Sequence, residues 1–265
     1  MNDLNYCQYA FAQPDCRVQE IGLGVDARFP VELVCDGPIA AVVSRIGLDH
    51  FVPDKLQGRT ADEVRWLGQI AARHNEIICQ AAQSSTVLPL RLGTLFRSRD
   101  SLRAALARSG PTVVGFLRRF RQRREWGVKL YWKKSPRESM MQHAGPAAPH
   151  YGPAARTGTG YLTQKKSELT ERRQLRAGVY ETLQTVEQRL SARAEDYRRI
   201  RTLPSELTGR SEEMVFNGAF LLPSSAQEPW SEIVERVGQE ISGQGLLLEL
   251  SGPWPPYHFC PSLEL

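Results

Sequence analysis

The chain has 265 residues, 41% hydrophobic and 24% charged, which is the composition of a folded globular protein and excludes disorder over its whole length. At about 100–200 residues per domain, this length predicts two domains or one large one. Lys and Arg number 34 against 29 Asp and Glu, so the net charge is +5, which permits an acidic partner without requiring one.

Neither membrane insertion nor secretion is expected. No apolar run approaches the ~18–20 residues of a membrane-spanning helix, and the first residues lack the basic and apolar regions of a signal peptide. The five cysteines are odd in number, widely spaced and free of any CxxC pair. This pattern predicts free thiols in a reducing cytoplasm, without a disulfide framework, a metal site or a cofactor.

The first half alternates strands and helices. Residues 4–12, 31–35 and 39–46 are predicted strands, the last two joined by a hairpin turn at Asp36-Gly37. A helix is expected over 62–83, capped by Thr60, because apolar residues recur at spacings of three and four. Residues 87–96 are predicted to form a strand, and Pro89 indicates that this strand lies at a sheet edge or contains a bulge. A further helix runs from Ser98 or Asp100 toward Arg124, with Gly110-Pro111 expected to kink or split it.

The second half begins with a period-two strand over 125–132. Residues 133–160 are rich in Pro and Gly and predict a mobile surface insertion. A charged amphipathic helix follows at 161–193, then strands at 196–203 and 213–222, a helix at 228–242 and a strand at 246–250. The order from residue 125 is β, α, β, β, α, β, which is typical of a ferredoxin-like fold. We therefore predict an α+β protein with an N-terminal domain at 1–124 and a ferredoxin-like domain at 125–265.

Sequence motifs give little support for catalysis. The histidines form no paired metal spacing, and Gly22-Leu23-Gly24 lacks the third glycine of a dinucleotide site. His258 and Cys260 suggest a nucleophile but have no third group nearby in the sequence. His74, on the stripe of the first helix, is interpreted as a histidine at the edge of the core.

A basic run at 118–124 contains five arginines and Phe120. Such a cluster could bind phosphates, but cations are also favoured at the carboxyl end of a helix. We prefer the helix-end interpretation, and we likewise interpret the helix at 161–193 as lying on a sheet in preference to a coiled coil.

Two stretches are unusual. Residues 87–96 place Arg91 in an apolar run, so its charge must face solvent or meet a carboxylate. Residues 252–259 (GPWPPYHF) are stiffened by proline and rich in aromatics. This segment either covers apolar surface of the body or presents a rigid patch to a protein partner.

With these two stretches, the sequence resembles the gas vesicle protein GvpF/GvpL family. PLRLGT (89–94) and GPWPPYHF (252–259) are the specific blocks. Weaker blocks are LVCDGPIAAVVSRI, EWGVKLY, GYLTQKK and EMVFNGAFLL, and all of them occur in the family's order. The insertion at 133–160 departs from the expected shorter connection.

The resemblance implies a non-enzymatic protein of gas vesicle formation, either a minor shell component or an assembly factor. It implies binding to the hydrophobic major shell protein GvpA and to accessory gas vesicle proteins. The expected location is the cytoplasm, on the gas vesicle, with its gas-facing surface as one option; neither nucleic acid nor lipid membrane is an expected partner. The residues predicted to bind the partner, by an apolar surface or an edge strand, are Arg91, Phe96, Trp254, Pro255, Pro256 and Tyr257.

Two other functions are kept as alternatives. A ferredoxin-like sheet could bind RNA or another acidic partner, although the chain lacks the aromatic octamer of RRM proteins. An enzyme using a cleft between domains is the other alternative; the absence of a motif counts only modestly against it, since many sites leave no trace in the sequence.

Overall fold

The computed structural model describes residues 4–47, 60–133 and 158–263, so the predicted insertion at 133–160 lies almost wholly outside the described residues. The chain is a mixed α/β protein with two antiparallel sheets. Contacts between residues divide it into two compact units, Met1–Glu125 together with Pro253–Leu265, and Trp126–Gly252.

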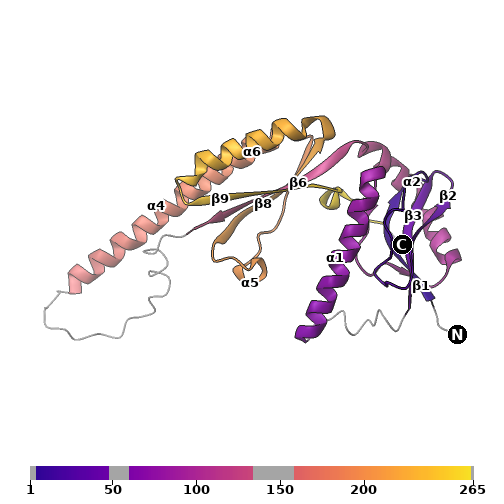
Figure 1. Cartoon of the computed structure of the whole chain (residues 1–265). Coiled ribbons are helices and arrows are strands. Elements are labelled where there is room, and N and C mark those ends of the chain that lie inside the picture. The colour runs from indigo at the N-terminus through magenta and orange to yellow at the C-terminus, as the bar shows by residue number, and fades with distance from the viewer. Residues whose placement is uncertain (1–3, 48–59, 134–157, 264–265) are drawn as a thin grey trace. The chain divides into compact units, whose positions relative to one another are not determined.

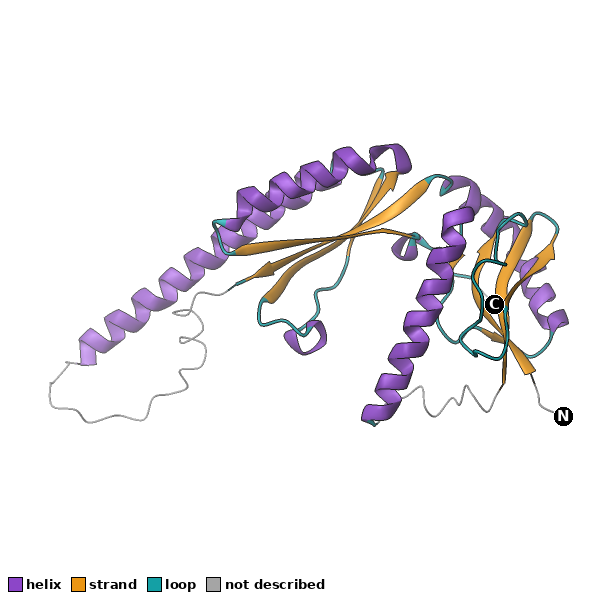
Figure 2. Cartoon of the chain, in the orientation of Figure 1, coloured by secondary structure: helices purple, strands orange, loops and turns teal. Residues whose placement is uncertain are grey.

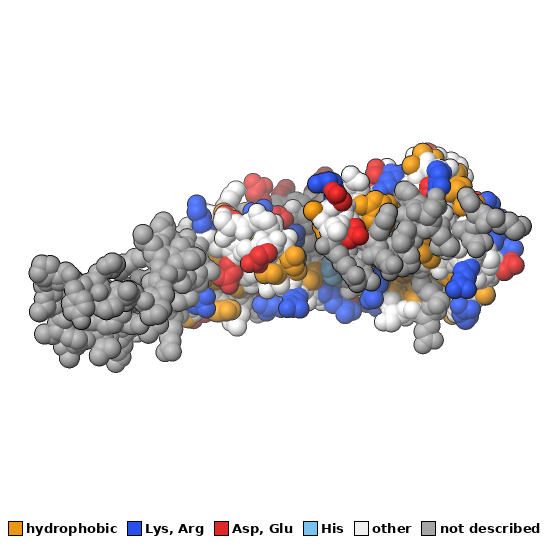
Figure 3. All heavy atoms as spheres, turned by 90° about the horizontal axis from the view of Figure 1, so that it is seen from below, with side chains coloured by type: hydrophobic (Ala, Val, Ile, Leu, Met, Phe, Trp, Pro, Cys, Tyr) orange, Lys and Arg blue, Asp and Glu red, His pale blue; other side chains and the backbone are white. Residues whose placement is uncertain are grey.

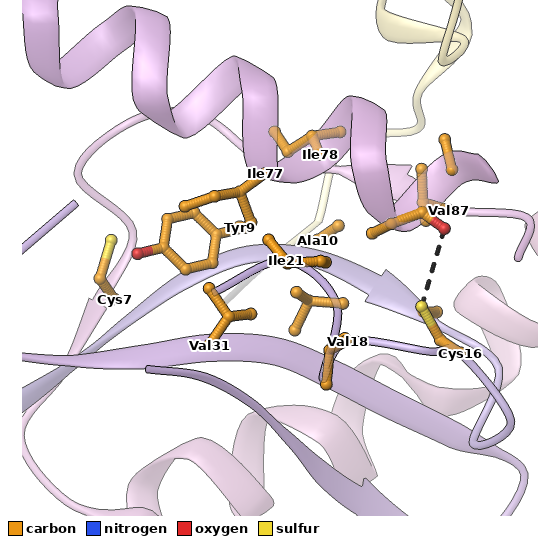
Figure 4. Packing of buried hydrophobic residues seen from close by; sticks show 14 of the residues in the cluster. Cys7, Tyr9, Ala10, Cys16, Val18, Ile21, Val31, Ile77, Ile78 and Val87 are labelled. Atoms are coloured by element: carbon orange, nitrogen blue, oxygen red, sulfur yellow. Dashed lines mark hydrogen bonds between the residues drawn. The ribbon is translucent and has the colours of Figure 1, made fainter. Parts of the chain in front are cut away.

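The first unit is built on a sheet in the order β2-β3-β1-β4, with β5 also paired to β1 (Figure 1). Helices α1 (Ala61–Ser84) and α2 (Arg99–Arg119) pack on this sheet from opposite faces (Figures 1 and 4). The strands are β1 (Leu4–Ala12), β2 (Val31–Asp36), β3 (Ile39–Gly47), β4 (Leu88–Pro89) and β5 (Leu95–Phe96).

Strand β1 lies at the centre of this core because both of its faces are covered by helices. Its register against β3 shifts between Gln8 and Ala10, so Tyr9 is the extra residue of a bulge. The shift allows Tyr9 and Ala10 to pack in the same cluster as Ile77 and Ile78 of α1 (Figure 4). A pure period of two would have placed them on opposite faces.

The predicted helix starts are confirmed. Thr60 and Glu63 form a reciprocal capping box at the start of α1, and Ser98 caps α2. The sequence predicts a kink or a split at Gly110-Pro111. The split is wrong, because α2 runs unbroken through Pro111. It ends at Arg119 rather than near Arg124, where Gln122 takes a positive φ of 56° and turns the chain into the next strand.

The predicted single strand at 87–96 is also corrected. It is split into the two-residue strands β4 and β5, which pair with different parts of β1. Pro89 has no N–H for a ladder, and Gly93 adopts a φ of +89° in the intervening turn. Thr94 closes that turn through its backbone N–H and its hydroxyl, both bonded to the carbonyl of Arg91.

The second unit has a four-stranded sheet in the order β7-β8-β6-β9. Helices α4 (Gly158–Ser191) and α6 (Gln227–Ser242) lie side by side on one of its faces (Figure 2). The strands are β6 (Arg123–Trp132), β7 (Asp196–Arg199), β8 (Glu213–Pro223) and β9 (Leu246–Trp254). Relative to the prediction, β7 is shorter, β9 is longer, and a short helix α5 (Ser205–Thr208) follows Pro204.

The core of this unit follows the predicted periods. Trp126, Val128, Leu130 and Trp132 alternate along β6 and all face the helices. Trp230 of α6 packs against Phe220 with ring centroids 5.1 Å apart. The described part of the α4 stripe, from Val179 to Leu190, completes the cluster.

The tail is where the observed division differs from the predicted domains at 1–124 and 125–265. Residues 253–265 belong by their contacts to the first unit and not to the second. The chain therefore passes between the units twice, at Glu125–Trp126 and at Gly252–Pro253. Across the described residues, no helix combines the length and apolarity needed to span a bilayer.

Candidate functional site

The proline-rich tail is fixed to the first unit by buried residues. Pro255 and Pro256 are buried, and a single 3-10 turn, Tyr257–Phe259, follows them. Phe259 is 6% exposed and its ring lies 6.4 Å from that of Phe120, just after α2. The tail therefore covers apolar surface of the first unit, the first of the two interpretations offered for this segment.

A buried carboxylate holds the tail at its turn. Glu125 is 3% exposed, and its two carboxylate oxygens accept hydrogen bonds from the backbone N–H of His258 at 2.9 Å and from the His258 Nδ1 at 2.6 Å. This contact with Glu125 raises the pKa of His258 above its usual 6.5. The pair satisfies a carboxylate that would otherwise be costly to bury.

Tyr257 attaches the tail to helix α1. Its hydroxyl donates to the side-chain oxygen of Asn75. Burial, together with the nearby Cys79 thiol, raises the pKa of Tyr257, so the phenol stays protonated at physiological pH.

The turn between β4 and β5 lies beside the tail. The carbonyl of Leu90 lies 3.1 Å from Nε2 of His74, a residue of α1 that is 5% exposed. Burial lowers the pKa of His74, so its ring is neutral at pH 7. His74 is thus a buried core residue that helps to hold the β4–β5 turn, close to the predicted role.

A groove of about 490 Å³ opens between this turn and the tail. We call it the tail groove; residues 88–91, Thr94, Tyr257 and 260–263 line it. Most of its lining residues are apolar by type, but the surface they expose is about equally polar and apolar. Arg91 is the one charged residue among the described lining residues, and its side chain is exposed. The groove therefore offers a mixed polar and apolar surface with one cation.

The predicted partner-binding residues divide into two groups. Arg91 and Tyr257 line the tail groove. Trp254, three residues before Tyr257 in the sequence, is 37% exposed. Phe96, Pro255 and Pro256 are buried in the first unit, so within this chain they support the fold rather than offer free surface.

Other residues of the site were missed from the sequence. Glu125 and Asn75 hold the tail, and Leu88 and Leu263 line the groove. These contacts join residues more than 100 positions apart, and no local spacing signals them. The one available hint was Glu125, an acidic residue at the start of an apolar strand.

The structure brings Glu125 to His258, the third group that sequence reasoning did not find for a Cys-His pair. The geometry nevertheless does not activate a nucleophile. The Cys260 thiol donates to the carbonyls of Pro256 at 3.2 Å and Pro89 at 3.8 Å, not to the imidazole. Burial, with the Glu125 charge, raises the pKa of Cys260 to about 12, so the reactive thiolate is scarce at neutral pH.

The basic run at 118–124 is partly engaged within the first unit. The Arg124 guanidinium donates to the carbonyl of Ala82 at 2.8 Å, in the last turn of α1. Arg119 lies over the Phe120 ring, and Arg123 bonds to the carbonyl of Arg121. On the face drawn in Figure 3, basic, acidic and apolar side chains of the described residues are intermingled.

Comparison with known proteins places the chain in a family. It belongs to the gas vesicle synthesis protein GvpL/GvpF family, whose model matches residues 6–261. Gas vesicle protein L from a Streptomyces species is 30% identical over 239 residues, covering 89% of this chain and 85% of that relative. Gas vesicle protein L2 of Halobacterium salinarum is 25% identical over 242 residues, covering 86% and 84%.

Two solved structures share the fold over nearly the whole chain. The crystal structure of gas vesicle protein GvpF from Anabaena sp. PCC7120 superposes with a TM-score of 0.66 at 19% identity, covering 98% of both chains. GvpF from Microcystis aeruginosa gives 0.63 at 16% identity, covering 97% of this chain and 99% of that one. The resemblance stated from the sequence blocks is thereby confirmed.

Proposed function

We propose that this chain acts without catalysis in gas vesicle formation, as a minor shell-associated component or an assembly factor. Its partners in this proposal are the major shell protein GvpA and accessory gas vesicle proteins. It works in the cytoplasm at the vesicle, and the gas-facing surface is one place where it could remain bound. Family membership supports the gas vesicle role, and the contact with GvpA is our inference.

One observation carries the choice of the tail groove as the binding surface. The two sequence blocks on which the resemblance rests, 89–94 and 252–259, lie far apart in the chain and contribute to the same groove or its margin. The covering role of the tail alone explains its buried prolines. It does not explain an exposed arginine in the lining of an open groove.

The chemistry of the groove suits a shell protein. A wall that encloses gas needs subunits with a strongly apolar face, and such subunits aggregate in water unless that face is covered before assembly. Apolar side chains in the lining of the tail groove, such as Leu90 and Leu263, fit part of such a face, and Arg91 fits an acidic side chain next to it. The expected ligand is therefore an apolar segment that carries a carboxylate.

The second unit is proposed to be ferredoxin-like. Its elements follow the order β6, α4, β7, β8, α6, β9, with α5 as an addition between β7 and β8. Both long helices cover one face of its antiparallel sheet, as the βαββαβ motif requires.

The proposal is tested by capture of newly synthesised GvpA on the purified, immobilised full chain. Arg91→Glu should weaken capture by about three- to tenfold, because a cation facing a carboxylate becomes a like charge. Trp254→Ala should weaken it as well, through lost apolar contact. Arg97→Glu is the matched control, since Arg97 is also exposed but does not line the groove.

Equal capture by the wild-type chain, Arg91→Glu and Trp254→Ala, with all three folded by circular dichroism, would reject the tail groove as the binding surface. No capture by the wild-type chain would reject GvpA as the partner.

A further inference from the structure

The sheet of the second unit has a long edge strand, β9, at the end of the order β7-β8-β6-β9. Three contacts fix its register on β6: Lys133 N–H to the Gly245 carbonyl at 2.9 Å, Lys129 to Glu249, and Ser251 against Gly127. All three contacts align β9 with β6 in the same register, so the pairing contains no bulge between Gly245 and Ser251.

The register determines which backbone groups face outward. Hydrogen-bonding direction alternates along an antiparallel strand. Because Gly245 faces β6, Leu246, Leu248 and Leu250 direct their N–H and C=O groups away from β6, toward an edge that no strand of the described residues covers. An unpaired edge of this kind is a template for another strand.

A groove of about 530 Å³ runs beside this edge, between β9 and helix α6. Leu248 and Leu250 form its β9 side, and Val234, Glu235 and Gly238 are on its α6 side. Gly238 has no side chain, and a Cβ added there would lie 3.5 Å from the Cβ of Leu248, at ordinary contact distance. Side chains of an added strand would enter this groove beneath the flank of α6.

The β4 edge of the first sheet is not equivalent to the β9 edge. Strand β4 is only two residues long, and Pro89, its outward-facing residue, has no N–H. The Pro89 carbonyl also faces the Cys260 thiol of the tail. The edge at 87–96, expected from the sequence as one route for partner binding, therefore offers few backbone groups for pairing, whereas no described strand pairs with the outer edge of β9.

We infer that β9 and the α6 groove accept one extended strand of a second gas vesicle protein by β-augmentation, an inference that rests on the proposed function. Backbone hydrogen bonds to Leu246, Leu248 and Leu250 supply affinity, and alternate side chains in the groove supply specificity. The strand carries small apolar residues on the groove side and a Lys or Arg that faces Glu235.

Charge selects this occupant over a second copy of the chain. Glu235 is exposed and is the charged residue among those lining the groove. Two-fold pairing of β9 with itself would bring two α6 helices together on the same face, with Glu235 on each side of the junction. Like charges on the two sides of the junction oppose this pairing, whereas a basic partner strand would meet Glu235 with the opposite charge.

The test uses 12-residue peptides that tile the gas vesicle proteins made by the same cell, titrated against the full chain. A basic, alternating peptide should bind, and it should slow amide hydrogen exchange at Leu248 and Leu250. Glu235→Lys should weaken this peptide by about fivefold. Glu232→Lys is the matched control, because Glu232 is an exposed acid of the same helix outside the groove.

Gly238→Met separates a blocked groove from a damaged fold. Methionine favours helix over glycine, and its Cβ meets Leu248 at ordinary contact distance, so the thermal midpoint should hold or rise while peptide affinity falls by about tenfold or more. Binding that survives this variant, or protection that appears only outside β9, would overturn the proposal. If GvpA still binds through Arg91 but no peptide protects β9, this inference fails and the proposed function stands. Self-association that depends on β9 would show that a second copy is the occupant.

Discussion

At the scale of single residues, Glu125 connects the tail to the body of the first unit. One carboxylate, 3% exposed, binds both the backbone and the imidazole of His258. Hydrogen bonds to charged groups contribute about 1.5–3 kcal/mol each, and the half-exposed imidazole lies at the lower end of that range.

Glu125→Ala should therefore destabilise the first unit by about 2–3 kcal/mol and release the tail, because it leaves the His258 amide without its acceptor. Glu125→Gln keeps a neutral acceptor and should cost less. Hydrogen exchange at the His258 backbone amide measures the effect directly. Glu20→Ala, at an exposed position, is the control; equal exchange rates in wild type and Glu125→Ala would contradict the assignment.

The Glu125–His258 contact also predicts a pH dependence. Contact with Glu125 raises the pKa of His258 in the folded chain above the usual 6.5. The stability contributed by the charged imidazole is therefore fully present below pH 6.5 and is lost as the pH rises through the raised pKa. The wild type minus His258→Gln difference in unfolding free energy should shrink over that window; a difference that grows with pH would contradict it.

The contribution of His74 to the free energy of unfolding should change with pH in the opposite direction. Burial lowers its pKa, so its neutral form is favoured on folding. Its contribution is present above pH 6.5 and is lost as the pH falls through the lowered pKa. The Cys260 thiol does not titrate in either of these pH ranges, since burial raises its pKa to about 12.

At the scale of elements, local chemistry predicted most of the fold. Three predicted features depend only on residues a few positions apart: the Thr60 cap, the Asp36-Gly37 turn and the alternating residues of β6. The helix, hairpin and strand that they predict all form at these positions. The failures are elements decided by distant partners. The run at 87–96 could pair with β1 only in two short pieces, and Pro111 was tolerated because tertiary packing holds α2 in place.

The candidate site was less accessible to sequence reasoning than the fold. The two blocks that carry the family resemblance contribute Arg91 and Tyr257 to the tail groove, and partner binding by these residues stays a prediction. The sequence could not show that Phe96 and Pro256 are buried, because Phe96 lies in β5, which pairs with the distant β1, and Pro256 lies in the tail, which returns to the first unit. Neither could it pair Glu125 with His258.

Two glycine substitutions test how closely these elements pack. A Cβ on Gly24 would lie 2.1 Å from Ser44 Oγ and 2.8 Å from the Tyr9 hydroxyl, which bonds Ser44 and the Val25 amide. Gly24→Ala should therefore destabilise the first unit by about 1–3 kcal/mol, as overpacking does. In helix α2, Gly115 has open space around it, so Gly115→Ala should stabilise by about 1 kcal/mol.

Thermal and urea unfolding of both variants provide the measurement. Equal effects at the two positions, or tolerance of Gly24→Ala, would show that the hydrogen-bonded cluster around Tyr9 is not packed as described.

At the scale of the whole molecule, the tail belongs to the first unit although the second unit precedes it in the chain. Deletion of residues 253–265 should therefore raise hydrogen exchange in α1 and after α2, where Tyr257 and Phe259 make their contacts. Exchange in α6 should stay as in the full chain. Increased exchange throughout α6, with α1 unchanged, would contradict the division into these two units.

The central claim is that this chain supports gas vesicle formation by binding shell protein through the tail groove. The most direct measurement is the yield of vesicles, read as pressure-sensitive turbidity, in cells whose own copy is replaced by the Arg91→Glu, Trp254→Ala double variant at matched protein level. The account predicts a large loss of vesicles, restored by the wild-type chain and by Arg97→Glu. A normal yield with the folded double variant would contradict it.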